Sequence, residues 1–84
     1  MSDVVVYTTE PCSWCARVKM LLQARKIEFR EVNLVDDPLG VQGLAERTGM
    51  MTLPQVVIGG TLVGGYKETV AADQSGLLDE LLAA

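Results

Sequence analysis

Residues 3–18 read DVVVYTTEPCSWCARV, and this stretch decides the fold that the sequence predicts. Asp3–Tyr7 is mostly apolar and β-branched, which is the composition of a buried strand. The polar loop Thr8–Pro11 follows and ends in a proline that suits the start of a helix. From Cys12 to about Lys26, apolar residues recur at intervals of three and four, as on one face of a helix. The stretch therefore predicts a strand, a loop and an amphipathic helix, with both cysteines of the chain at the loop–helix junction.

The two cysteines, Cys12 and Cys15, are separated only by Ser13 and Trp14. The thiolate is the reactive form of cysteine, and the N-terminus of a helix stabilises a negative charge. We therefore expect the pKa of Cys12 to lie below the value of about 8.5 that a free thiol has. Cys15, one turn further along, is close enough to attack a mixed disulfide formed at Cys12. The spacing predicts a pair that forms, breaks and exchanges disulfides.

Three other interpretations of the cysteines stay open at this point. A structural disulfide here would enclose only two residues, so it would constrain the unfolded chain weakly. A Cys-x-x-Cys motif beside a β-α-β pattern favours a redox role instead. Because the chain has no histidine, a Cys–His dyad is excluded, and a zinc site would need carboxylates or a second chain to complete it. A pair of inert cysteines that only pack in the core is the third alternative.

The composition indicates one small domain outside the membrane. The chain has 84 residues, of which 49% are hydrophobic, and its formal net charge is −4. This is enough apolar material for a core, and the lack of an obvious basic stripe argues against nucleic acid as a partner. No stretch approaches the ~20 apolar residues that span a bilayer. Met1–Asp3 has no basic residue, and the apolar run after it is too short for a secretory signal. We therefore expect a cytoplasmic protein.

The rest of the chain predicts alternating strands and helices. Ile27–Leu34 is an imperfectly alternating strand that a helical crossover would place parallel to the first. The acidic cap and proline at 36–38 begin a second helix, which Gly49 ends. The remaining elements are two strands, Gln55–Ile58 and Thr61–Val63, around the turn Gly59-Gly60, a helix from Lys67 to about Ala72 that breaks near Gly76, and a final amphipathic turn or two over Leu77–Leu82. The order β-α-β-α-β-β-α predicts a thioredoxin-like α/β fold, with a four-stranded mixed sheet flanked by about three helices.

With these residues in view, the whole chain closely resembles a glutaredoxin. The motifs that carry the resemblance are CSWC at 12–15 after the strand end VYT, TLPQVVI at 52–58, and the double glycines at 59–60 and 64–65. A single Cys-x-x-Cys is a weak signal, but this set in this order is strong. The resemblance implies one glutaredoxin-like domain over residues 1–84. It also implies a thiol–disulfide oxidoreductase that reduces protein disulfides and glutathione mixed disulfides, with glutathione as reductant and co-substrate.

The resemblance also assigns roles to the residues of the redox site. Cys12 would be the nucleophile, and Cys15 would be the resolving thiol that protein disulfides require and deglutathionylation does not. Pro54 would be a cis-proline beside the cysteine pair, although without the motif an ordinary loop proline is the favoured interpretation. The backbone of Leu53 would pair in β fashion with an extended thiol peptide.

A glutathione site follows from the same resemblance. The turn Gly65-Tyr66-Lys67 would present N–H groups to the glutamyl carboxylate, and Thr52 would lie beside Leu53 and Pro54. Trp14 would form a flat wall for a bound peptide. Arg47 or Arg17 would meet a glutathione carboxylate. From the residues alone, these arginines and Lys19 read as solvated helix faces.

The sequence departs from the family pattern at three places. No lysine precedes Cys12, and Glu10 in that stretch would oppose a thiolate. Lys67 stands where an acidic residue usually pairs with the glutathione amine, so Glu68 or Thr69 would have to replace it. Ser13 and Trp14 stand where Pro-Tyr is common. In relatives, a serine there is compatible with a [2Fe–2S] cluster that Cys12 and glutathione bridge between two chains.

These departures leave the electron source open. Glutathione is the expected reductant, and the alternative is a redoxin that takes electrons from thioredoxin reductase and serves ribonucleotide reductase. An iron–sulfur carrier is the alternative from another class. We otherwise expect a monomer whose partners are protein disulfides and glutathionylated proteins.

Overall fold

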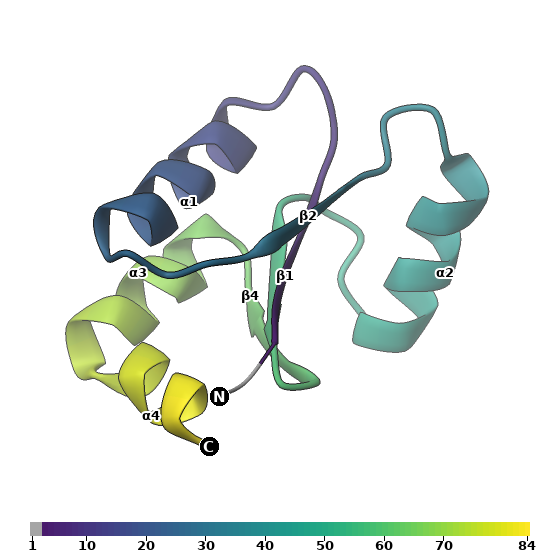
Figure 1. Cartoon of the computed structure of the whole chain (residues 1–84). Coiled ribbons are helices and arrows are strands. Elements are labelled where there is room, and N and C mark those ends of the chain that lie inside the picture. Colours follow the sequence, from purple (N-terminus) through teal and green to yellow (C-terminus); the bar gives the residue numbers. More distant parts are fainter. Residues whose placement is uncertain (1–2) are drawn as a thin grey trace.

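The computed structural model describes residues 3–84, and its elements follow the predicted order (Figure 1). They are β1 (Val4–Thr8), α1 (Ser13–Ala24), β2 (Arg30–Asn33), α2 (Pro38–Thr48), β3 (Gln55–Ile58), β4 (Thr61–Gly64), α3 (Tyr66–Ser75) and α4 (Leu77–Ala83). Met1 and Ser2, on which part of the expectation about a secretory signal depends, lie outside the described residues. Within residues 3–84, no helix combines the length and the apolar character that a bilayer crossing requires.

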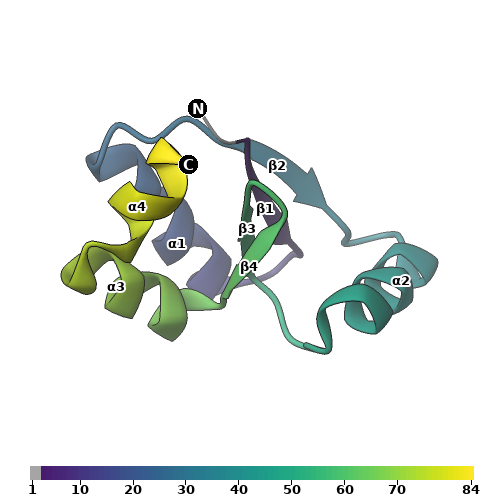
Figure 2. The ribbon, with the colours of Figure 1, turned by 90° about the horizontal axis from the view of Figure 1, so that it is seen from below.

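The four strands form one mixed sheet in the order β2-β1-β3-β4. β1 and β2 run parallel, and β3 is antiparallel to both β1 and β4. Helices α1, α3 and α4 lie on one face of this sheet, and α2 lies alone on the other (Figure 2). The thioredoxin-like prediction is therefore confirmed, and four helices flank the sheet because the last predicted helix is divided at Gly76, which has a φ of 86°.

The core lies between the sheet and the three helices on one of its faces. Successive side chains of a strand point to opposite faces, so β1 sends Val4 and Val6 into this core, and Val5 points to the face that α2 covers. α1 contributes Val18 and Leu22, which are fully buried. This packing fixes the start of α1, which carries the cysteines, against the end of β1.

Helix α1 is shorter than the periodicity predicted. It begins at Ser13, with Cys12 as its N-cap, and ends at Ala24, so Pro11 precedes the cap instead of opening the helix. The chain leaves the helix through Lys26, whose φ of 58° is outside the helical region. Lys26 adopts this left-handed conformation although it is not a glycine. The chain then turns back toward β2.

Strand β2 is also shorter than the alternation predicted, since it covers only Arg30–Asn33 of the expected Ile27–Leu34. Its length is set by pairing with β1, from Val5 opposite Arg30 to Thr8 opposite Asn33. The apolar residues before it, Ile27 and Phe29, pack against the core without strand pairing.

Helix α2 begins and ends as its capping residues predicted. The Asp37 side chain accepts a hydrogen bond from the Gly40 N–H at 2.9 Å, and Pro38 is the first helical residue. Gly49 ends the helix with a φ of 77°, a left-handed conformation that favours glycine. The turn at Gly49 directs the following loop, residues 50–54, toward the cysteines.

Candidate active site

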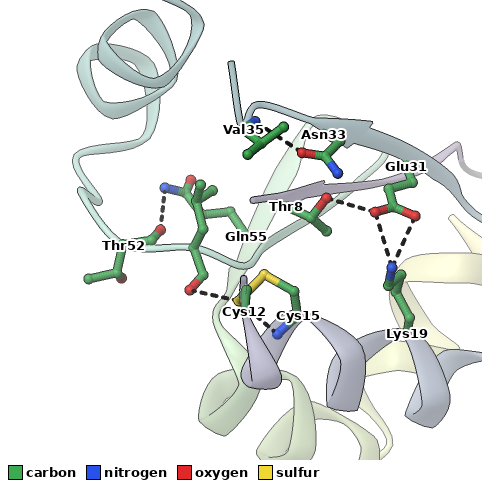
Figure 3. The surroundings of a disulfide bond; sticks show 10 residues. Thr8, Cys12, Cys15, Lys19, Glu31, Asn33, Val35, Thr52 and Gln55 are labelled. Carbon is green, nitrogen blue, oxygen red and sulfur yellow. Dashed lines mark hydrogen bonds and ion pairs between the residues drawn. A yellow bond between two sulfur atoms is a disulfide. The ribbon is translucent and has the colours of Figure 1, made fainter. Parts of the chain in front are cut away.

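Cys12 and Cys15 form a disulfide at the junction of β1 and α1, with their Cα atoms 5.3 Å apart (Figure 3). Only 2% of Cys15 is exposed, whereas Cys12 is partly exposed. A disulfide or thiol in solution can therefore reach the first sulfur and is largely excluded from the second. This difference in access matches an attacking cysteine followed by a resolving one.

The sulfur of Cys12 caps α1. Its backbone is extended, and its Sγ accepts a hydrogen bond from the Cys15 N–H at 3.0 Å. The first N–H groups of a helix lack partners within the helix, so the sulfur satisfies one of them. The first turn of α1 contains no acidic residue. After reduction, the same N–H group and the helix dipole would favour a thiolate at Cys12 over a thiol.

The backbone of Leu53 lies beside the accessible sulfur. The Leu53 carbonyl oxygen is 4.0 Å from Cys12 Sγ, and the Leu53–Pro54 peptide bond is cis, as the resemblance implied. A disulfide sulfur carries no hydrogen, so this distance describes a contact and not a hydrogen bond. Pro54 is buried. The loop therefore places a main-chain edge within reach of a molecule attached to Cys12.

Trp14 joins the starts of α1 and α3. Its ring centroid is 5.3 Å from that of Tyr66, with the planes inclined at 40°. The guanidinium carbon of Arg17 lies 4.9 Å from the Trp14 ring centroid, which is a cation–π distance. The tryptophan remains 50% exposed. Arg17 is therefore engaged with Trp14, and its spacing of three residues along a helix is the signal that would have indicated this contact.

The start of α3 differs from the expectation at Gly65. The Gly65 N–H donates to the Glu68 carboxylate at 2.8 Å, and the Thr69 hydroxyl donates to the Gly65 carbonyl, also at 2.8 Å. Glu68 and Thr69 therefore close the start of their own helix. The N–H groups of Tyr66 and Lys67, in the first turn of α3, could still meet a carboxylate.

Two more residues of the expected site, Arg47 and Thr52, are exposed. Arg47 is exposed in the last turn of α2, on the other face of the sheet from α1. Among residues 3–84, no hydrogen bond or ion pair joins it to the cysteines or to α3, so its role stays a prediction. Thr52 is exposed in the loop before Leu53.

A polar cluster beside the disulfide was not predicted. The buried Thr8 hydroxyl donates to Glu31 at 2.7 Å, and Lys19 donates to both oxygens of the same carboxylate at 3.1 and 3.2 Å (Figure 3). The hydrogen bond from Thr8 is the largest influence holding the pKa of Glu31 below its usual value, with Lys19 acting in the same direction and burial opposing both. One charged carboxylate thus ties β1, β2 and α1 together.

Gln55 is a further residue of the site that the sequence analysis did not identify. It was expected only as a strand residue, but its side chain is 1% exposed and bonds to the loop before Pro54. A polar residue opening an otherwise apolar strand was the available signal.

A separate groove lies at the opposite end of α1. Its lining includes Arg25, Phe29, Asp73 and Leu78, and Arg25 forms a two-bond ion pair with Asp73 at 2.9 Å. It contains neither cysteine and no residue of the loop before Pro54. The groove is therefore distinct from the redox site.

The chain is similar to known glutaredoxins in sequence and structure. The glutaredoxin family model matches residues 4–63. A glutaredoxin of Pseudomonas aeruginosa is 42% identical over 84 residues, covering all of both chains. The solution structure of a glutaredoxin from Brucella melitensis has a TM-score of 0.86 at 40% identity, covering 98% of this chain and 89% of that one. A buckwheat glutaredoxin–glutathione complex has a TM-score of 0.88 at 28% identity, covering 98% of this chain and 77% of that one.

Proposed function

The chain belongs to the glutaredoxin family of thiol–disulfide oxidoreductases, and we propose that it uses glutathione to reduce protein disulfides and glutathione mixed disulfides. The observation that carries this proposal is the Cys12–Cys15 disulfide, with one sulfur accessible at a helix N-terminus and the other covered. Glutathione as the reductant is supported by the buckwheat relative, which was solved with glutathione.

In the first step, the Cys12 thiolate attacks one sulfur of the substrate disulfide. A bond forms between Cys12 and that sulfur as the substrate S–S bond breaks, and the other substrate sulfur leaves as a thiolate that takes up a proton. The Cys15 N–H and the dipole of α1 stabilise the attacking thiolate. Because nucleophilicity falls as a thiol pKa falls, a moderate lowering of the pKa serves this step best.

The mixed disulfide on Cys12 can then be resolved in two ways. In the first, a glutathione thiolate attacks the glutathione sulfur of the mixed disulfide, which forms glutathione disulfide and expels the Cys12 thiolate. Alternatively, the Cys15 thiolate attacks Cys12 and expels the bound protein thiol, which leaves the intramolecular disulfide seen in the structure. Two glutathione molecules then reduce that disulfide. Contact of Cys12 Sγ with Leu53 supports a bound peptide lying along the Leu53 backbone.

The glutathione carboxylates would lie among Trp14, the first turn of α3 and a basic side chain. Helix N-terminal N–H groups favour an anion, and Lys67 adds a positive charge at that turn. Arg47 is the more distant candidate. We place this activity in the cytoplasm, where the glutathione pool keeps dithiols reduced, and we expect a monomer.

Two other functions are the alternatives to this proposal. Thioredoxin reductase could supply the electrons, with ribonucleotide reductase as the recipient. For an iron–sulfur carrier, residues 3–84 contain no group of three or more metal-binding side chains. A [2Fe–2S] cluster on Cys12 would thus need ligands from outside the chain.

The electron source is tested with Trp14, the only tryptophan in the chain, as a fluorescence reporter beside the disulfide. The oxidised protein is mixed with NADPH and either glutathione with glutathione reductase or thioredoxin reductase alone. Rapid signal change with the glutathione system supports the proposal, and change only with thioredoxin reductase refutes it. The Cys15→Ser variant, which cannot form the internal disulfide, is the matched control and should give no such signal.

A further inference from the structure

The side chain of Gln55 holds the loop that precedes Pro54. Its Nε2 group donates to the carbonyl oxygens of Met50 and Thr52, both at 3.0 Å. Both amide hydrogens are thus used, and the residue is only 1% exposed. Figure 3 shows the amide turned away from the disulfide and toward Thr52.

The orientation of this amide is determined by its partners. The Gln55 Oε1 atom is buried and has no hydrogen-bond partner among the described residues. Exchanging the nitrogen and oxygen would place three oxygen atoms together, so the observed orientation is the one that forms hydrogen bonds. Burying an unpaired polar atom is unfavourable. A glutamine at this position therefore has a cost, because its Oε1 atom is buried without a partner in an otherwise apolar strand. We take this cost to indicate that the two N–H donors of its amide are required.

The hydrogen bond to Thr52 has a consequence for Leu53. The Thr52 carbonyl and the Leu53 N–H belong to the same peptide unit, which is trans. In a planar trans peptide these two groups point in opposite directions. Because Gln55 draws the carbonyl toward the protein interior, the Leu53 N–H is directed away from the buried amide. The carbonyl of Leu53 itself lies beside Cys12 Sγ.

We propose that Gln55 is a positioning residue for substrate: its buried amide fixes the Thr52–Leu53 peptide plane and so presents the Leu53 N–H to the backbone of a peptide disulfide. The inference rests on the proposed function and deepens it. Gln55 does not touch the substrate or either sulfur. Its effect is therefore confined to substrates that have peptide groups to pair with Leu53.

Two small disulfides separate this role from general structural support. The homodisulfide of N-acetylcysteine amide carries peptide groups, and 2-hydroxyethyl disulfide carries none. Each is mixed with reduced protein in a single turnover without glutathione, and Trp14 fluorescence reports formation of the Cys12–Cys15 disulfide. The Gln55→Met variant keeps the length of the side chain and removes both donors. Leu39→Met, on the exposed surface of α2, is the matched control.

We expect Gln55→Met to react about tenfold more slowly with the peptide disulfide, the loss that corresponds to about 1.4 kcal/mol of misaligned hydrogen bonding. Its reaction with 2-hydroxyethyl disulfide should be unchanged. An equal loss for both disulfides, or no loss for either, overturns the proposal. Since glutathione is absent, the outcome does not depend on which reductant the protein uses.

The unmodified protein gives a test that does not depend on folding of the variant. In NMR hydrogen-exchange spectra, the Gln55 side-chain amide protons should exchange far more slowly than those of the exposed Gln23, Gln42 and Gln74. Exchange of all four at the same rate overturns the proposal, because the amide would then not be held by the loop.

Discussion

Replacing Thr8 with valine should destabilise the oxidised protein by about 0.5–2 kcal/mol. Thr8 is 1% exposed, and its hydroxyl donates to the Glu31 carboxylate at 2.7 Å. A hydrogen bond to a charged group contributes about 1.5–3 kcal/mol. Valine has nearly the same shape, so no cavity forms, and its extra buried methyl group returns about 0.8 kcal/mol. Water also reaches the Glu31 side chain, which is 32% exposed, and this reduces the loss.

The dependence on pH identifies the cause of this loss. The folded protein lowers the pKa of Glu31, chiefly through Thr8. A carboxyl group of this kind stabilises the fold at pH values above its unfolded pKa, and that contribution disappears as the pH falls through the folded pKa. The difference between the parent and Thr8→Val should therefore be largest at neutral pH and shrink in acid. In the variant, the pKa of Glu31 should rise toward its usual value.

Urea unfolding of the oxidised proteins at neutral and acid pH measures the difference, and NMR titration of the Glu31 carboxyl carbon measures its pKa. In thermal unfolding, each kcal/mol should lower Tm by about 4–8 °C for a domain of this size. Thr8→Ser keeps the hydroxyl and is the control. A Thr8→Val protein as stable as the parent at neutral pH, or an equal loss at both pH values, would refute the reasoning.

Three further changes test the packing, the backbone and the chemistry. Leu22→Ala should cost about 2–5 kcal/mol in urea unfolding because Leu22 is fully buried, whereas Leu39→Ala at an exposed site should change stability by less than about 0.5 kcal/mol. Gly49→Ala should cost about 1–2 kcal/mol because φ is 77°, and Gly43→Ala inside α2 should instead stabilise; the reverse order would contradict the assigned helix end. Cys15→Ser should retain removal of glutathione from a glutathionylated peptide and lose reduction of protein disulfides; loss of both activities would show that Cys15 does more than resolve.

The parts of the fold that the sequence predicted well are those with local signals. Asp37 and Pro38 begin α2, and Gly49 ends it, because capping and left-handed turns depend on neighbouring residues. The length of β2 was overestimated because the apolar alternation starts at Ile27, whereas the pairing with β1 that sets the length of the strand starts at Arg30. One local signal was available but not used. Glu68 lies three residues after Gly65, as in a capping box, and this spacing indicates that the Gly65 N–H is hydrogen-bonded to the Glu68 carboxylate.

The unpredicted parts of the site depend on contacts between distant segments. Thr8 and Glu31 are 23 residues apart, so no window of sequence pairs them. Trp14 meets Tyr66 only because α1 and α3 pack on the same face of the sheet. The cysteine pair was predictable because its chemistry follows from a spacing of three residues and from its position at a helix start.

The most direct test asks which cysteine attacks a disulfide. Reduced Cys12→Ser and Cys15→Ser proteins are incubated with glutathione disulfide, and intact-protein mass spectrometry follows the gain of a glutathionyl group. Because Cys12 is accessible and caps α1, whereas Cys15 is 2% exposed, we expect rapid modification of Cys12 in the Cys15→Ser protein and little modification of the Cys12→Ser protein. Equally rapid modification of Cys15 in the Cys12→Ser protein would contradict the assignment of Cys12 as the nucleophile.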